Sequence, residues 1–255
     1  MSPNVSRGTI RRKNSTLTND EISLRSLAQK NGVPITDIQL EKISRYVGLL
    51  QHWNKSINLI SRKDVENVWL NHIVLSLAFL FKVDLVGGAK ILDLGTGGGL
   101  PGIPLSIVRP DVNFVLVDSI QKKTKAVQEM AASLGLPNAS VIWSRAEDLN
   151  TLNNYQNAFD AVIARAVAGL EKLVKWGMPF LKKPPVPKTV SETTEKIMVS
   201  KSPALITMKG GNIDAEIEKT RRRFPDVKIY SLQLIFKGGE MLQGLDKKLI
   251  VVENV

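Results

Sequence analysis

The 255-residue chain has no cysteine and only two histidines, His52 and His72. The lack of cysteine excludes disulfide bonds, thiolate nucleophiles and cysteine-ligated zinc. Two histidines do not supply a histidine-rich site, and no bound metal is expected. No apolar run approaches the roughly 18 residues of a membrane-spanning helix, so the chain is not expected to insert into a membrane. No secretory signal pattern is present either, which favours a cytoplasmic protein.

Acidic residues are few for the number of basic ones. The chain carries 35 lysines and arginines against 24 aspartates and glutamates, a formal net charge of +11 at pH 7. This excess favours a polyanionic partner, nucleic acid first and an anionic membrane second, although a solvated basic surface gives the same count. Residues 1–19 hold four basic residues and no acid, so we predict a disordered basic tail there. A short organelle-targeting leader is the alternative.

Residues 20–86 are predicted to form a layer of helices packed on the rest of the chain. A capping sequence begins at Thr18 and favours a helix to about Asn31, with Gly32 as its stop. Thr36 and Gln39 have the spacing of a capping box in front of apolar residues at helical intervals. A third apolar segment spans about 65–81.

Residues 87–255 alternate short apolar strands with helices, which indicates a mostly parallel sheet covered on both faces. The last two strands have no helix between them, so an antiparallel hairpin is expected at one edge. A proline-rich stretch at about 182–203 is predicted to be a flexible surface insertion. The predicted strands are 89–94, 114–117, 140–143, 161–164, 205–208, 227–236 and 248–252, and the predicted helices are 102–108, 122–134, 170–181 and 215–223.

A glycine cluster follows the first strand of this region, and two ligands fit it. Residues 97–102 match the dinucleotide fingerprint G-x-G-x-x-G. The alternative is the arrangement of S-adenosylmethionine sites, an acid at the strand end followed by alternating glycines: Asp93, Gly95 and Gly97. The acid could organise the methionine ammonium group, while the glycine backbone passes beneath the ligand. A glycine-rich turn without a ligand is the third possibility.

Acidic residues after the next two strands help to distinguish a dinucleotide from S-adenosylmethionine as the ligand. Asp118 ends the second strand, where a carboxylate can accept both ribose hydroxyls in either kind of site. Ala146 and Glu147 follow the third strand, where backbone and acid can read the adenine edge of a methyl donor. As structural residues, these acids would be helix caps or loop carboxylates. Together they favour the methyl donor.

The residues that the chain lacks also restrict the acceptor. Methylation at pyrimidine C5 needs a cysteine, and amino-group methyltransferases usually carry a [DN]-P-P-[FY] loop; neither is present. Hydride transfer usually needs a downstream acid or base, and no histidine follows the glycine cluster. Guanine N7 has an available lone pair, so its methylation depends mainly on orientation and electrostatics. Basic residues near the predicted strand ends, Arg145 and Arg165 above all, suit contacts with RNA.

The chain resembles the RsmG (GidB) family of small-subunit ribosomal RNA methyltransferases over roughly residues 22–253. The resemblance rests mainly on the run DLGTGGGLPGIPL from Asp93 to Leu105. Supporting segments are Trp53-Asn54-Lys55, Asn58-Leu59, His72-Ile73, Val117-Asp118-Ser119, Lys122-Lys123, Ser144-Arg145-Ala146-Glu147, Phe159-Asp160, Ala164-Arg165-Ala166 and Lys209-Gly210. Leu75 stands where the family usually has an acid, and the 182–203 insertion is not typical of it.

The resemblance implies a class I S-adenosylmethionine-dependent methyltransferase: a Rossmann-like, seven-stranded, mostly parallel sheet with an N-terminal helical layer. It implies methylation of guanine N7 in the 530 loop of 16S rRNA, at guanosine 527, with 16S rRNA or the small ribosomal subunit particle as partner. We expect the protein to be a monomer. Arg165 is implied to position substrate and cofactor, with no general base. The implied cofactor contacts are Asp93, Gly95, Gly97, Leu100, Asp118, Ser119, Ile120, Ala146, Glu147 and Arg165, and the implied RNA contacts are Lys122, Lys123, Arg145 and Lys209.

Two other functions remain open at this point. The first is a class I methyltransferase that acts on another RNA or on a small molecule. The second is a ribosome- or RNA-binding module with a vestigial cofactor loop. Binding of S-adenosylmethionine separates the binding module from both enzymes, and the methylated product separates the two enzymes.

Overall fold

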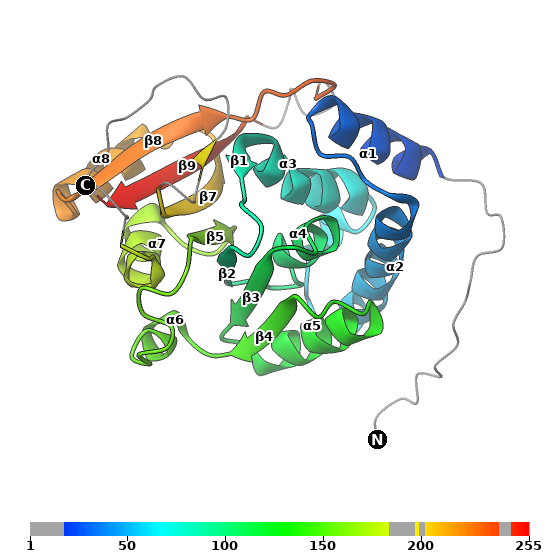
Figure 1. The fold of residues 1–255 in the computed structure, drawn as a ribbon, viewed down its shortest axis with the longest axis horizontal. Helices are drawn as coiled ribbons and strands as arrows, with labels where there is room; N and C mark the ends of the chain where they lie inside the picture. The colour runs from blue at the N-terminus through cyan, green and yellow to red at the C-terminus, as the bar shows by residue number, and fades with distance from the viewer. Residues whose placement is uncertain (1–17, 184–196, 199–201, 240–245, 255) are drawn as a thin grey trace.

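The computed structural model describes residues 18–183, 197–198, 202–239 and 246–254. A seven-stranded sheet crosses the molecule in the order β4-β3-β2-β5-β7-β9-β8 (Figure 1). Five neighbouring strands are parallel, and β9 pairs antiparallel with both β7 and β8, which confirms the predicted edge hairpin. The strands are β2 (Lys90–Leu94), β3 (Asn113–Asp118), β4 (Ala139–Trp143), β5 (Ala161–Arg165), β7 (Ala204–Gly210), β8 (Val227–Gln233) and β9 (Lys247–Asn254).

Both faces of the sheet are buried, which explains the nearly continuous apolar strands. Side chains along a strand alternate between faces, so Ile91 belongs to one core while Leu92 and Leu94 belong to the other. Helices α1 to α5 pack on the first core and α6 to α8 on the second (Figure 1). Those of the α/β region are α4 (Gly102–Val108), α5 (Gln121–Ser133), α6 (Ala146–Leu149), α7 (Leu170–Gly177) and α8 (Asp214–Arg223).

The N-terminal helices begin where the capping sequences predict. Helix α1 (Asn19–Lys30) starts after Thr18, and α2 (Asp37–Asn54) starts after Thr36 with a reciprocal capping box to Gln39. The Gln39 side chain also donates to the last carbonyls of α4, at 3.0 and 3.2 Å. The third apolar segment is divided, because a π-helix (η2, Trp69–Val74) precedes α3 (Leu75–Lys82).

Several local predictions are corrected. Within the predicted insertion, β6 (Ile197–Met198) pairs in parallel with β1 (Val83–Asp84), so this part of the segment is ordered by a partner distant in sequence. Residues 184–196 and 199–201 lie outside the described residues, as does the basic tail through residue 17. The predicted helix 170–181 ends at Gly177, where a 3₁₀ turn containing Pro179 follows. Among the described residues, no helix is long and apolar enough to cross a membrane.

Candidate active site

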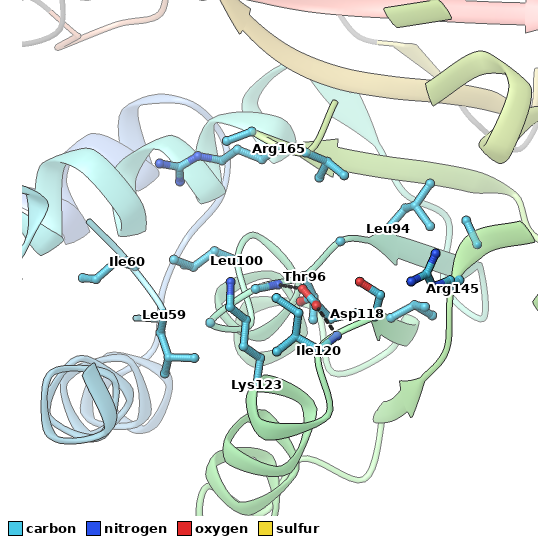
Figure 2. A pocket seen from close by; sticks show the side chains of 18 of the residues that line it. Leu59, Ile60, Leu94, Thr96, Leu100, Asp118, Ile120, Lys123, Arg145 and Arg165 are labelled. Carbon is cyan, nitrogen blue, oxygen red and sulfur yellow. Dashed lines mark hydrogen bonds between the residues drawn. The ribbon is translucent and has the colours of Figure 1, made fainter. Parts of the chain in front are cut away.

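A cavity of about 640 Å³ lies at the carboxyl ends of β2, β3, β4 and β5 (Figure 2). In open α/β sheets ligands bind at this edge, where the strand order reverses direction, here between β2 and β5. The glycine cluster forms the floor of the cavity. Its lining includes the predicted cofactor residues Gly95, Gly97, Leu100, Asp118, Ser119, Ile120, Ala146, Glu147 and Arg165, and also Leu59, Ile60, Ser61, Asp64, His72 and Thr96, which had no predicted role.

The glycine loop needs its glycines for both conformation and space. Gly95, Gly97 and Gly99 have φ values of +74°, +58° and +95°, a region that other residues rarely adopt. A Cβ atom on Gly95 would lie only 2.6 Å from a methyl group of Val167, which follows β5. The loop is also tied to the N-terminal layer, since the Tyr46 hydroxyl donates to the Gly98 carbonyl at 2.9 Å. The backbone therefore presents a closely packed surface to the cavity.

Asp93 supports this loop from inside the protein. Its Oδ2 accepts hydrogen bonds from Thr96 Oγ1 at 2.6 Å and from the Gly102 N–H at 2.9 Å. Complete burial raises the pKa of Asp93 to about 7, against the lowering effect of these two hydrogen bonds. The side chain does not line the cavity. This corrects the predicted ammonium contact, because the carboxylate is used internally to hold the start of α4 against the end of β2.

Asp118 holds the loop from the cavity side. Its Oδ2 accepts from the Gly97 N–H and its Oδ1 accepts from the Ile120 N–H, both at 2.9 Å (Figure 2). The half-buried carboxylate lies beside Ser119 and Ile120 in the cavity lining. Each oxygen keeps acceptor capacity beyond the backbone bond that it makes. Asp118 can therefore fix the loop and still accept hydroxyl groups from a ligand.

Two further predicted cofactor residues, Ala146 and Glu147, lie at the start of helix α6, a helix that was not predicted from the sequence. Ala146 is buried at the first position of α6, and Glu147 is exposed beside it. Both line the cavity, with Arg145 as the N-cap residue. Backbone N–H groups at a helix start lack partners within the helix and face outward. This end of the cavity offers one apolar surface and one carboxylate.

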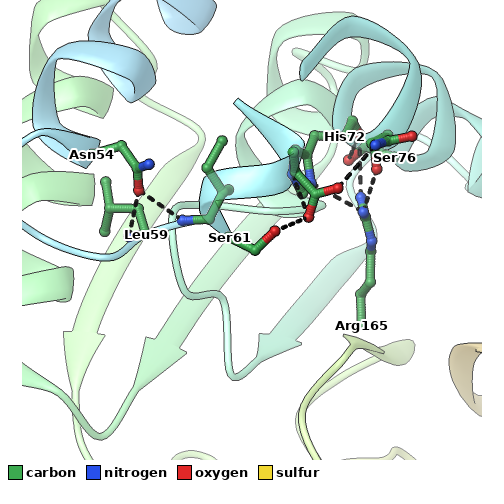
Figure 3. A network of polar contacts seen from close by, with 9 residues as sticks. Asn54, Leu59, Ser61, His72, Ser76 and Arg165 are labelled. Atoms are coloured by element: carbon green, nitrogen blue, oxygen red, sulfur yellow. Dashed lines mark hydrogen bonds and ion pairs between the residues drawn. The ribbon is translucent and has the colours of Figure 1, made fainter. Parts of the chain in front are cut away.

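Arg165 ends β5 and reaches across the cavity to the π-helix (Figures 2 and 3). Its guanidinium donates to the carbonyl of Asn71 and, at 3.3 Å, to the carbonyl of His72. It also lies 3.0 Å from Nδ1 of the His72 ring. No carboxylate pairs directly with it in the described part of the chain. Its positive charge is thus oriented by the backbone and a ring nitrogen but not neutralised.

His72 and Asp64 extend this network. Burial, and next the nearby Arg165 charge, lower the pKa of His72 to about 4, so the ring is neutral at pH 7. Since Nδ1 faces a donor, the ring proton lies on Nε2, which is 3.7 Å from Asp64 Oδ2. Asp64 is held by Ser61 Oγ at 2.6 Å and by the Asn71 amide at 2.9 Å. These bonds lower the pKa of Asp64 and keep it ionised.

The four predicted RNA contacts lie in different settings. Lys123 and Arg145 line the cavity, and Lys122 is exposed on α5 outside it. Lys209 is half-buried; its Nζ donates to the Ala168 carbonyl at 2.8 Å and pairs with Glu216 at 3.0 Å. Lys209 is thus the one of the four that is engaged within the described part of the protein. No cluster of three or more potential metal ligands occurs among the described residues.

Comparison with known proteins places the chain in a family. The sequence model described as GidB, rRNA small subunit methyltransferase G, matches residues 39–186. A ribosomal RNA small subunit methyltransferase G of Chlorobium luteolum is 41% identical over 199 residues, covering 78% of this chain and 74% of that protein. The chain belongs to this methyltransferase family. The Porphyromonas gingivalis member is 36% identical over 211 residues, covering 80% of this chain and 88% of that protein.

As a family member with this sheet, the protein is a class I methyltransferase, and its methyl donor is S-adenosylmethionine. A solved S-adenosylmethionine-dependent methyltransferase from Aquifex aeolicus aligns with a TM-score of 0.45 at 16% identity, covering 68% of this chain and 85% of that one. The cavity fits such a donor: its volume is in the range of cofactor sites, and bare glycine backbone lies beside an acceptor carboxylate on Asp118.

Proposed function

We propose that this enzyme transfers the methyl group of S-adenosylmethionine to N7 of guanosine 527 in the 530 loop of 16S rRNA. The observation that carries the proposal is the polar lining of the cavity. His72 has no free acceptor nitrogen, and Asp64 and Asp118 are bound to neighbouring groups. The described lining thus places an oriented cation at the site but no free histidine base. Guanine N7 is an acceptor that needs none.

The residues that would hold the cofactor follow the order of the strands. Gly95, Gly97 and Leu100 would contact its amino-acid part, and Asp118, Ser119 and Ile120 its ribose. Ala146 and Glu147 would contact its adenine. Their positions around one cavity support this assignment. S-adenosylmethionine supplies an electrophilic methyl group when it is bound.

The protein's own task is to orient the nucleotide and to exclude water. N7 must stay free for attack, so Arg165 can hold the nucleotide only through another acceptor, such as a phosphate oxygen. Its guanidinium is already fixed by two carbonyls, which lowers the entropy lost on binding. Lys122, Lys123 and Arg145 would contact the RNA backbone near the mouth of the cavity. We further propose that the protein acts in the cytoplasm, as a monomer, on 16S rRNA or the small-subunit particle.

The test is methylation of 16S rRNA by the purified protein with S-adenosylmethionine labelled in its methyl group. The substrate is RNA from a bacterial strain that lacks this modification. N7-methylguanosine makes the strand cleavable by borohydride and aniline, so cleavage reports the base and position together. We expect one cleavage site, at guanosine 527. Label without cleavage, cleavage elsewhere, or no label on naked RNA and on subunit particles would each refute the proposal.

A further inference from the structure

A second hollow, of about 560 Å³, lies on the N-terminal layer. Its polar lining consists of Gln51, His52, Asn54, Lys55, Asn58 and Arg62, which come from the end of α2, the loop after it and the 3₁₀ turn that Arg62 begins. We call this hollow the α2 groove. Its lining contains amides, a histidine and two cations, but no carboxylate. A groove of this composition suits an anionic ligand with hydrogen-bonding groups.

The charged side chains of the α2 groove have no partners within the described part of the protein. Lys55 and Arg62 are exposed and make no side-chain hydrogen bond or ion pair there. By contrast, Lys219 on α8 lies 2.9 Å from Glu171, and Arg222 lies 3.0 Å from Glu218. The groove therefore keeps its positive charge, whereas Lys219 and Arg222 on α8 are each paired with a carboxylate.

One short segment separates the α2 groove from the cofactor cavity. Asn54 Oδ1 accepts from the N–H groups of Leu59 at 2.8 Å and Ile60 at 3.0 Å and so fixes the loop (Figure 3). Leu59 and Ile60 line the cavity, while Lys55 and Arg62, on either side of them in sequence, line the groove. A polymer lying in the groove would thus be one short segment away from a group in the cavity.

We propose that the α2 groove binds the RNA strand next to the methylated nucleotide, with Lys55 and Arg62 contacting phosphates and the amides contacting sugar or base edges. The inference rests on the proposed RNA substrate. Lys123 and Arg145 line the cavity and also lack carboxylate partners among the described residues. The strand would thus meet unpaired cations both in the groove and beside the target nucleotide.

The test compares two double variants that each remove two positive charges. Lys55→Ala with Arg62→Ala alters the groove, and Lys219→Ala with Arg222→Ala is the control on α8. Affinity is measured against salt concentration for two probes, a 530-loop RNA and oligouridylate. Each lost phosphate contact on a single strand lowers the slope of log affinity against log salt by about 0.7. We expect a loss of about 1.4 and weaker binding for the groove variant only, with cofactor affinity unchanged in both.

The outcomes separate the two proposals. If the groove variant keeps the wild-type slope, or if the control loses as much, the groove is not an RNA site even when guanosine 527 is methylated. If the wild type leaves guanosine 527 unmethylated, the proposed function fails. The slope with oligouridylate still decides the groove, because phosphate contacts do not depend on sequence. Thermal unfolding of both variants checks that the fold is intact.

Discussion

Replacement of Asp93 by asparagine tests whether this acid is a structural residue buried under the glycine loop. Between pH 3.8 and about 7 the folded protein keeps the Asp93 proton, whereas the unfolded chain has released it. The unfolded state then binds fewer protons, so the free energy of unfolding falls as the pH rises. At 1.36 kcal/mol per pH unit, this loss totals about 4 kcal/mol by neutral pH.

The Asp93→Asn variant keeps an oxygen to accept from Thr96 and Gly102 but has no proton to lose. Its amide would occupy the Oδ1 position, which is buried without a hydrogen-bond partner, at a cost of about 1–3 kcal/mol. We therefore expect the variant to be less stable than the wild type near pH 4. It should equal or exceed the wild type near pH 7, because the wild type loses stability over this interval.

The assay is urea unfolding of both proteins from pH 4 to pH 8, with the difference in free energy plotted against pH. The difference between the two proteins is used because His72 titrates in the same pH range and changes the free energy of unfolding in the opposite direction. Its pKa falls from 6.5 unfolded to about 4 folded, so its contribution to stability rises with pH between these values. A difference that stays constant with pH would show that Asp93 is ionised in the folded protein, and would refute the reasoning.

Three further outcomes follow from the same contacts. Gly95→Ala should lower the melting temperature by more than Gly135→Ala does, and it should also weaken cofactor binding. Both glycines have positive φ, but only a Cβ on Gly95 would clash with Val167. Equal melting temperatures of the two variants would argue against that clash. His72→Gln should remove about 3 kcal/mol of the pH dependence of urea unfolding between pH 4 and 6.5, and an unaltered profile would mean that His72 is protonated when folded. Arg165→Ala should slow methyl transfer at least tenfold, with a smaller loss of cofactor affinity by calorimetry; equal losses would make it a cofactor residue only.

Local rules predicted most elements of the fold because their signals lie within a few residues. The capping box at Thr36 and Gln39 set the start of α2. Helix α5 ends at Ser133, close to the predicted end at residue 134, and Gly135, at φ +60°, follows its C-cap. The apolar strands indicated a sheet buried on both faces, and two separate cores confirm it. The strand ends in turn gave the edge of the sheet at which Asp118, Ala146 and Arg165 meet.

The features that could not be predicted from the sequence depend on contacts between residues far apart in the chain. His72 and Arg165 are 93 positions apart, and no spacing rule connects them. The pairing of β1 with β6 joins segments that are each only two residues long, too short for a periodic signal. Lys209 looked like a free cation at a strand end, but Glu216, one turn into the next helix, neutralises it. A residue type and a position do not show which partner a side chain has.

The N-terminal helices differ from the α/β region in sequence pattern, but they contribute directly to the cavity that the two regions share. Arg165 belongs to β5, yet the carbonyls that orient its guanidinium come from Asn71 and His72 in the π-helix. π-Helical turns are rare and concentrate at functional sites, where the altered ladder redirects backbone groups. Tyr46 likewise fixes the glycine loop from α2. An isolated α/β region would keep the cavity residues that follow β2 to β4 but lose the carbonyls that orient Arg165, so the helices are needed for the position of this guanidinium.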